Sequence, residues 1–184
     1  RTAAILQRSR PDLGEDAIVA MAPVVAGIGR LDRELRNGVA HPLVGTASVH
    51  TSTIAGGGEW STYPDRCRLD VERRALPGEI PAQVADELRA LLPESGSVRV
   101  AFVREPLETS ATEPLVEALR RAAGTELVGM PFWTDAALFA AAGMPSVVFG
   151  PGGGGLHELV EWADLDQLDR AVAVFAELVD TFCA

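Results

Sequence analysis

The sequence predicts an α/β protein in two parts: a ferredoxin-like α+β sandwich over residues 1–105, followed by part of an α/β layer over residues 106–184. The first part shows patterns in the order strand, helix, strand, strand, helix, strand. After a polar connector bounded by prolines, the order becomes helix, helix, buried strand, glycine-rich loop and helix. The chain begins without Met inside a strand-like stretch, so we expect a fragment whose first strand is truncated.

The composition is that of an acidic globular chain. Its 184 residues are 47 % hydrophobic, enough apolar content for a buried core. The net charge is −10 and the basic residues are scattered, which argues against nucleic acid as a partner. No apolar run has the length of a membrane span, and the first residues do not resemble a signal peptide. Cys67 and Cys183 make no disulfide framework, so we expect a reducing, cytoplasmic location.

The first part contains two predicted helices. Apolar residues recur at steps of three and four over residues 12–37, the spacing of an amphipathic helix that Pro23 should kink. These apolar positions are Ala17, Ile18, Met21, Val25, Ile28, Leu31 and Leu35. Residues 80–96 predict the second helix, with Pro81 in its first turn and Gly96 after its end.

Three strands accompany these helices. Residues 45–58 are rich in β-branched side chains, and residues 65–79 alternate apolar with charged ones, so we expect two neighbouring strands. Residues 97–105 alternate again and predict the last strand of the sandwich. His50 in the first of these strands has no carboxylate or cysteine at ligand spacing, and neither has His41, so both are interpreted as structural or solvated.

The second part predicts helices over residues 114–124 and 134–143, then a buried strand over residues 144–150 with Val147 and Val148 at its centre. An amphipathic helix closes the chain. One side of this last helix carries Leu168, Val172, Phe175 and Val179.

A glycine-rich loop follows the buried strand and leads to His157. Ligands of open α/β sheets bind beyond the carboxyl ends of the strands, so this loop is the first candidate site. Three interpretations remain open: a backbone cradle for an anion, a metal-binding or acid–base role for His157 beside Glu158 and Glu161, and a solvated His at a helix start. The segment lacks the Lys-Ser/Thr tail of a P-loop, and Glu161 replaces the second His of a zinc helix, so neither motif is predicted.

Several stretches, read together and in order, resemble the M20 family of metallopeptidases and deacylases. They are SRPDLGEDAI, IAGGGEWSTYPDRCRLDVERRALPGE, and TDAALFAAAGMPSVVFGPG followed by LHELVEWADLDQL. The resemblance covers nearly the whole chain. It implies that residues 1–105 are a lid, or dimerisation, domain and that residues 106–184 are the carboxyl-terminal part of an α/β catalytic domain.

The family resemblance implies a zinc-dependent amidohydrolase or peptidase that acts on N-acylated amino acids or small peptides. Two zinc ions, with cobalt or manganese as alternatives, would activate a water for attack on the amide carbonyl. The resemblance also implies a homodimer formed through the lid domain.

Individual roles are carried over by position. His157 matches a ligand of one zinc ion, and Glu161 matches a residue that fixes the following loop and helix. Arg74 matches the lid arginine that holds the substrate carboxylate, a task suited to a guanidinium because it binds two oxygens at once. The alternative for Arg74 is an exposed strand end that shares a salt-bridged lattice with Arg73. The glycines of the loop, Gly152, Gly153, Gly154 and Gly155, match a backbone lining of the substrate pocket.

Two positions depart from the family pattern. Gln7 stands where the lid domain carries a His that stabilises the oxyanion, and a glutamine donates a hydrogen bond without charge. Ser61 stands where many members have an Asn that contacts the substrate.

The family's other metal ligands and its general-base Glu match nothing in this sequence. One imidazole is not a catalytic zinc site, so we expect the isolated chain to be inactive. The alternative function is a non-catalytic dimerisation or binding module.

Overall fold

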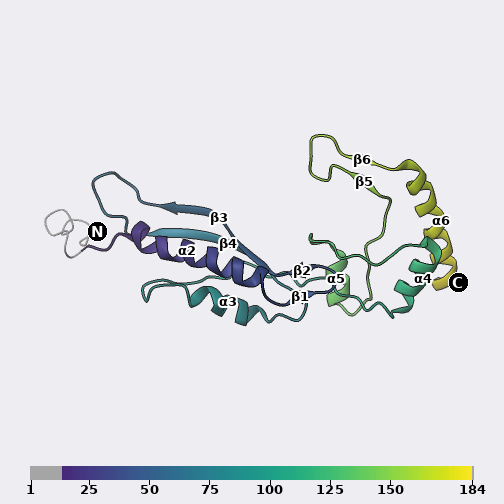
Figure 1. Ribbon diagram of the computed structural model, residues 1–184, viewed down its shortest axis with the longest axis horizontal. Helices are drawn as coiled ribbons and strands as arrows, with labels where there is room; N and C mark the ends of the chain where they lie inside the picture. Colours follow the sequence, from purple (N-terminus) through teal and green to yellow (C-terminus); the bar gives the residue numbers. More distant parts are fainter. Residues whose placement is uncertain (1–13, 184) are drawn as a thin grey trace. The chain divides into compact units, whose positions relative to one another are not determined.

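The structure is a computed structural model that describes residues 14–183. The chain divides into two compact units, one reaching to Arg104 and the other beginning at Glu105, and each is described by itself. Both units combine helices with strands, in line with the predicted α/β class (Figure 1). No helix of residues 14–183 has both the length and the apolar character that a membrane span requires.

The long helix of the first unit is α2 (Ala17–Arg36), which lies within the predicted range. Its start is set by Asp16, whose Oδ1 accepts hydrogen bonds from the N–H groups of Ile18 and Val19 at 2.9 and 3.1 Å. Such a cap satisfies two of the N–H groups that a helix start leaves unpaired. Pro23 lies inside the helix.

The predicted strand pair is confirmed as β3 (Ser48–Gly56) and β4 (Cys67–Arg74), which run antiparallel from Ser48 opposite Arg74 to Gly56 opposite Cys67. The register shifts between Thr51 and Thr53, so Ser52 is the extra residue of a β-bulge. Because of this shift, Thr51 pairs with Val71 on one face, whereas Thr53 pairs with Asp70 on the other.

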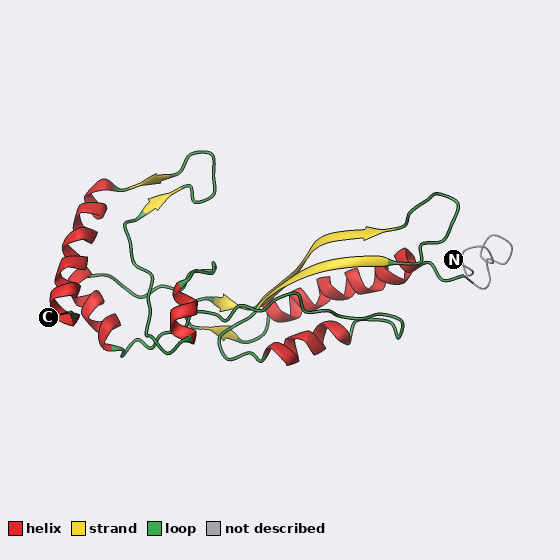
Figure 2. Ribbon diagram, turned by 180° about the vertical axis from the view of Figure 1, so that it is seen from behind, coloured by secondary structure: helices red, strands yellow, loops and turns green. Residues whose placement is uncertain are grey.

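One face of this strand pair is covered by α2 (Figure 2), and α3 (Pro81–Arg89) adds Leu88 to the same core. The core of the unit consists of Val24 and Ile28 from α2 and Val49 from β3. Partly buried side chains packed against it are Met21, Leu31, Leu35, Leu69, Val71, Leu88, Leu91 and Leu92. Helix–strand–strand–helix is therefore the part of the ferredoxin-like order that the described residues contain.

The strand predicted over residues 97–105 is not formed. A strand exists only where a neighbour completes its hydrogen-bond ladder, and this segment pairs with none of the described residues. Val100, Phe102 and Val103 are accordingly 50–75 % exposed. The predicted first strand lies in residues 1–13, outside the described part. An unpredicted short ladder joins β1 (Ala40–His41) to β2 (Gly45–Thr46).

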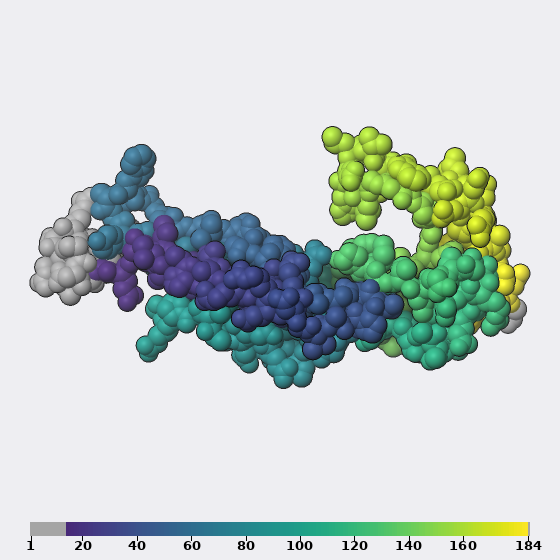
Figure 3. All heavy atoms as spheres, viewed as in Figure 1, coloured from purple at the N-terminus to yellow at the C-terminus, as the bar shows by residue number. Residues whose placement is uncertain are grey.

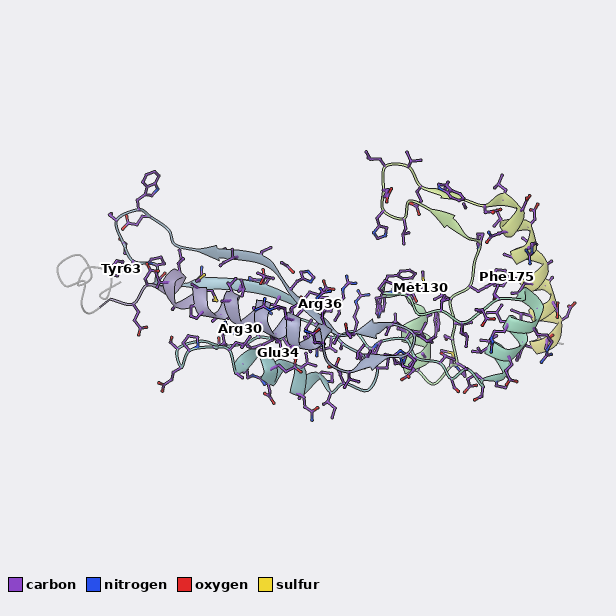
Figure 4. All side chains as sticks on the ribbon, viewed as in Figure 1. Arg30, Glu34, Arg36, Tyr63, Met130 and Phe175 are labelled. Carbon is purple, nitrogen blue, oxygen red and sulfur yellow. The ribbon has the colours of Figure 1, made fainter. Side chains whose placement is uncertain are left out.

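The second unit is built on α4 (Pro114–Ala123) and α6 (Leu165–Phe182), which pack against each other, and it also contains the short α5 (Ala136–Ala141). Leu119, Ala123 and Val174 form its buried cluster. Phe149 and Phe175 add an edge-to-face aromatic pair with ring centroids 5.6 Å apart. Phe175, on α6, is labelled in Figure 4.

The buried strand predicted over residues 144–150 is also not formed. Val147 and Phe149 pack on the cluster of the unit, but Val148 between them is 53 % exposed, so the segment is covered on one side only. Likewise, the apolar side predicted for the last helix is 43–63 % exposed, and the buried positions of α6 are Ala171 and Val174. Helix α4 covers the positions next to the predicted stripe rather than the stripe itself.

Candidate functional site

The first candidate group, His157, lies in the loop that joins the two short strands β5 (Gly153–Gly154) and β6 (Trp162–Ala163). This loop extends away from α4 and α6 in the space-filling view (Figure 3). His157 has φ +66°, the only non-glycine residue of 14–183 in the left-handed region, and its side chain is exposed. A left-handed backbone is costly for a residue with a Cβ atom and is often found at functional positions.

The helix start expected at His157 is not present. Residues 156–160 form turns and bends, and the N–H of Glu158 donates to the carbonyl of Gly155 at 2.8 Å. Helix α6 begins only at Leu165, eight residues later, with Asp164 as its cap. The interpretation of His157 as a solvated helix-start residue is therefore wrong, although the residue is exposed.

The glycines are required by the close approach of the two sides of this hairpin. A Cβ atom at Gly153 would collide with the carbonyl oxygen of Trp162, and one at Gly155 with that of Val160. At Gly154 a Cβ atom would come within 2.8 Å of the Trp162 ring nitrogen. Backbone packing thus explains why this run tolerates no side chains.

Two residues that the sequence analysis did not select hold the glycine loop to α6. The Gly152 N–H donates to Oε1 of Gln167 at 2.8 Å, so this N–H is already satisfied. The N–H of Gln167 donates in turn to Oδ1 of Asp164 at 3.1 Å. Asp-x-x-Gln is the spacing of a helix capping box, so this signal was visible in the sequence. No comparable bond from Glu161 to α6 is found among the described residues, and its side chain is exposed.

A metal site is not assembled by residues 14–183 alone. Within this range no three side chains of His, Cys, Asp or Glu gather in a group that could hold an ion. His157 is therefore a single candidate ligand here, and a catalytic zinc site needs three protein ligands.

The two neighbouring arginines at the end of β4 occupy different environments. Arg73 is turned toward the helices: its side chain is 4 % exposed, its Nη2 lies 2.6 Å from Oε1 of Glu79 and its Nε lies 3.2 Å from Oε2 of Glu87. Burial alone would raise the pKa of Glu79, but the Arg73 guanidinium and the Leu76 N–H together hold that pKa below its ordinary value.

Arg74 points to the opposite face of the strand pair, and its side chain is 55 % exposed. Its Nε lies 3.4 Å from Oε1 of Glu72, two residues earlier on the same strand. The guanidinium of Arg73 thus pairs with Glu79 and Glu87 on the helix side of the strand pair, whereas that of Arg74 pairs with Glu72 on the other side. Arg74 is accessible to an incoming group, whereas Arg73 is committed to the fold.

Glu72 also faces His50 directly across the ladder, and its Oε2 lies 3.3 Å from Nε2 of this imidazole. The sequence places no carboxylate at ligand spacing from His50; its acidic neighbour comes from the adjacent strand, because partners across a ladder are distant in sequence, and the imidazole itself is exposed, as expected of a solvated residue. We call the exposed side of the strand pair, with Ser48, His50, Thr53, Arg68, Asp70, Glu72 and Arg74, the polar face.

Two further residues were predicted for the site. Ser61 lies in the exposed loop that joins β3 to β4, next to Trp60, whose side chain is fully exposed. Gln7 lies outside the described residues.

Comparison with known proteins gives a consistent result over nearly all of the chain. A profile of peptidase family M20/M25/M40 matches residues 5–181. The chain is 28 % identical to acetylornithine deacetylase of Myxococcus xanthus over 94 % of its own length and 48 % of that protein. It is 26 % identical to N-formyl-4-amino-5-aminomethyl-2-methylpyrimidine deformylase of Bacillus subtilis, over 93 % of this chain and 47 % of that one. The chain thus spans about half the length of the curated relatives it matches.

Two solved structures with the same fold are those of peptidases. An aminopeptidase PepT of Bacillus cereus superposes with a TM-score of 0.72 at 17 % identity, over 95 % of this chain and 48 % of that one. A metallo-carboxypeptidase of the M20 family from Sulfolobus solfataricus gives a TM-score of 0.62 at 16 % identity, over 93 % of this chain and 53 % of that one. At these identities the likeness concerns the fold alone.

Proposed function

This chain belongs to peptidase family M20/M25/M40, and from that premise we propose that it forms part of a metal-dependent hydrolase that cleaves amide bonds in N-acylated amino acids or small peptides. The observation that carries the proposal is the family match over residues 5–181. It is supported by the two curated relatives, whose names describe the removal of an acetyl and a formyl group.

The division of the chain follows from the two units. The unit that ends at Arg104 would act as the lid, which also joins two copies into a homodimer. The unit that begins at Glu105 would contribute the carboxyl-terminal part of the catalytic domain. In this arrangement α2, β3, β4 and α3 are a rigid platform, and the polar face is the side left open to a substrate.

Arg74 is the residue that we assign to the free carboxylate of the substrate. Of the two adjacent arginines, Arg73 has its guanidinium enclosed between Glu79 and Glu87. Arg74 has a half-exposed guanidinium on the polar face, where two oxygens of a carboxylate can reach it. Ser61 and the backbone of Gly152–Gly155 would contact other parts of the substrate, and Gln7 would donate a hydrogen bond without charge to the oxyanion.

His157 is the residue that we assign to a metal ion, with zinc as the expected ion and cobalt or manganese as alternatives. An exposed imidazole, held on a glycine loop in a left-handed conformation, supports this role. Residues 14–183 do not supply the further ligands, so they do not fit a complete metal site and no catalytic step is derived through one. The other donors would come from outside these residues.

The test is hydrolysis of N-acetyl amino acids by the protein as its gene encodes it, together with its metal content. We expect hydrolysis that a chelator removes and added zinc restores, and that His157→Ala abolishes. The 184-residue chain on its own should show no turnover. A gene product that is a metal-free dimer without hydrolysis would contradict the proposal and favour the alternative, a dimerisation or binding module.

A further inference from the structure

The acid groups of the polar face are held with unequal strength. Asp70 accepts hydrogen bonds from Oγ1 of Thr53 at 2.6 Å and from Nε of Arg68 at 2.9 Å, so both of its oxygens are firmly bound. Glu72 has only longer contacts, 3.3 Å to His50 and 3.4 Å to Arg74, and its side chain is 49 % exposed. Glu72 is therefore the acid of this face that is most easily displaced.

The geometry of Glu72 places one oxygen on each of two cationic or proton-donating groups. Its Oε1 faces Nε of Arg74 and its Oε2 faces Nε2 of His50. The register brings the three residues to one face, because Glu72 and Arg74 are two residues apart on one strand and His50 is the ladder partner of Glu72.

We propose that Glu72 is a built-in competitor for Arg74: its carboxylate occupies the guanidinium until an incoming carboxylate displaces it, and His50 then retains the displaced group. Glu72 and His50 are positioning residues in this role, and Arg74 is the group that touches the ligand. The inference rests on the proposed function of Arg74 as the carboxylate anchor and adds a control of its affinity. A ligand without a carboxylate cannot displace Glu72, so the arrangement discriminates against neutral ligands.

A competitor of this kind has a measurable consequence for affinity. Removing the charge of Glu72 frees Arg74 from competition, and an exposed ion pair of this type corresponds to roughly a two- to fivefold change in a dissociation constant. Removing His50 has the opposite effect, since the displaced Glu72 then has no alternative partner and returns to Arg74.

The experiment is a titration of the ¹⁵N-labelled 184-residue chain with sodium acetate at constant ionic strength, followed at the side-chain Nε–Hε signal of Arg74. Arg74→Lys identifies this signal by its loss, and acetamide is the neutral control ligand. We expect Glu72→Gln to tighten acetate binding roughly two- to fivefold and His50→Ala to weaken it. The matched control is Asp70→Asn, which removes the same charge from the same strand face but leaves Glu72 on Arg74.

The outcomes separate the inference from the proposed function. An acetate response at Arg74 that Glu72→Gln leaves unchanged, or that Asp70→Asn strengthens equally, overturns the competitor role and leaves the anchor role intact. No response at Arg74 in either the parent or Glu72→Gln overturns both. If Glu72→Gln alters the spectrum of the whole unit, Glu72→Asp, whose shorter side chain reaches Arg74 less well, provides the same comparison with the charge retained.

Discussion

Nη2 of Arg73 lies 2.6 Å from Oε1 of Glu79, on the side of β4 that faces the helices, and the arginine side chain is 4 % exposed. Glu87 of α3 approaches the same guanidinium from the other side, with its Oε2 3.2 Å from Nε. One buried cation thus joins the strand pair, the turn after it and α3. The first prediction follows from the cost of leaving two partly buried carboxylates without this partner.

Arg73→Ala should lower the free energy of unfolding by about 2–3 kcal/mol, which is less than the roughly 3–5 kcal/mol for breaking a fully buried ion pair, because both acids keep some exposure. Urea denaturation followed by circular dichroism measures it. Arg74→Ala is the matched control on the neighbouring exposed position and should change stability by no more than about 0.5 kcal/mol. An equal decrease in the free energy of unfolding in the two variants would show that Arg73 does not join the strand pair to α3 through its ion pairs.

The second prediction concerns the pH dependence of stability. The pKa of Glu79 is lowered from its ordinary value of 4.5, so the folded chain binds this proton more weakly than the unfolded chain does. The stabilisation from Glu79 is therefore present above about pH 4.5 and is lost as the pH falls through the lowered pKa. In Glu79→Gln the free energy of unfolding should therefore fall less steeply than in the parent as the pH decreases below about 4.5. An acid limb as steep as that of the parent would refute the assignment.

The elements that the sequence predicted well are those whose partners are close in sequence. The periodicity of α2 and the alternation in β4 are local properties, and Met21, Ile28, Leu31 and Leu35 of α2 and Leu69 and Val71 of β4 pack in the core as that spacing predicts. The predicted face of α2 is wrong at two positions, because Ile18 and Val25 are exposed and Val24 is buried instead. The segments 97–105 and 144–150 carry the same kind of pattern without forming strands, because a strand also needs a neighbour to complete its ladder. The order of apolar and polar residues therefore indicates which side of a segment is apolar, but not whether a neighbouring strand is present to pair with it.

The candidate site shows the same limit more sharply. Arg73 and Arg74 are adjacent and chemically identical. Only the position of the helices decides that Arg73 is buried in ion pairs and that Arg74 is exposed. The neighbour of His50 depends on a register that includes a bulge, which no local spacing reveals. By contrast, the link from Asp164 to Gln167 has a recognisable spacing and could have been predicted.

The third prediction tests that link between the glycine loop and α6. Gln167→Ala should release the N–H of Gly152, which would then exchange its hydrogen faster. Asp164→Ala removes the helix cap itself and should cost about 1 kcal/mol. Asp169→Ala, at an exposed position farther along α6, is the control and should leave Gly152 exchange unchanged. Unaltered Gly152 exchange in Gln167→Ala would mean that the loop is held by other contacts.

The last prediction concerns the strained backbone at His157, with φ +66°. A left-handed residue with a Cβ atom costs about 1–2 kcal/mol, whereas glycine adopts this conformation freely but loses about 0.5–1 kcal/mol through its more flexible unfolded chain. His157→Gly should therefore stabilise the chain by roughly 0.5–1 kcal/mol. Glu158→Gly, where no positive φ is relieved, should destabilise it. With His157 as a metal ligand, the same substitution also abolishes metal-dependent hydrolysis. A rise in stability together with a loss of activity is the result expected for a residue that serves the chemistry rather than the fold. The free energy of unfolding of both variants is measured by urea denaturation. A decrease in His157→Gly as large as that in Glu158→Gly would show that the left-handed backbone at His157 does not destabilise the chain.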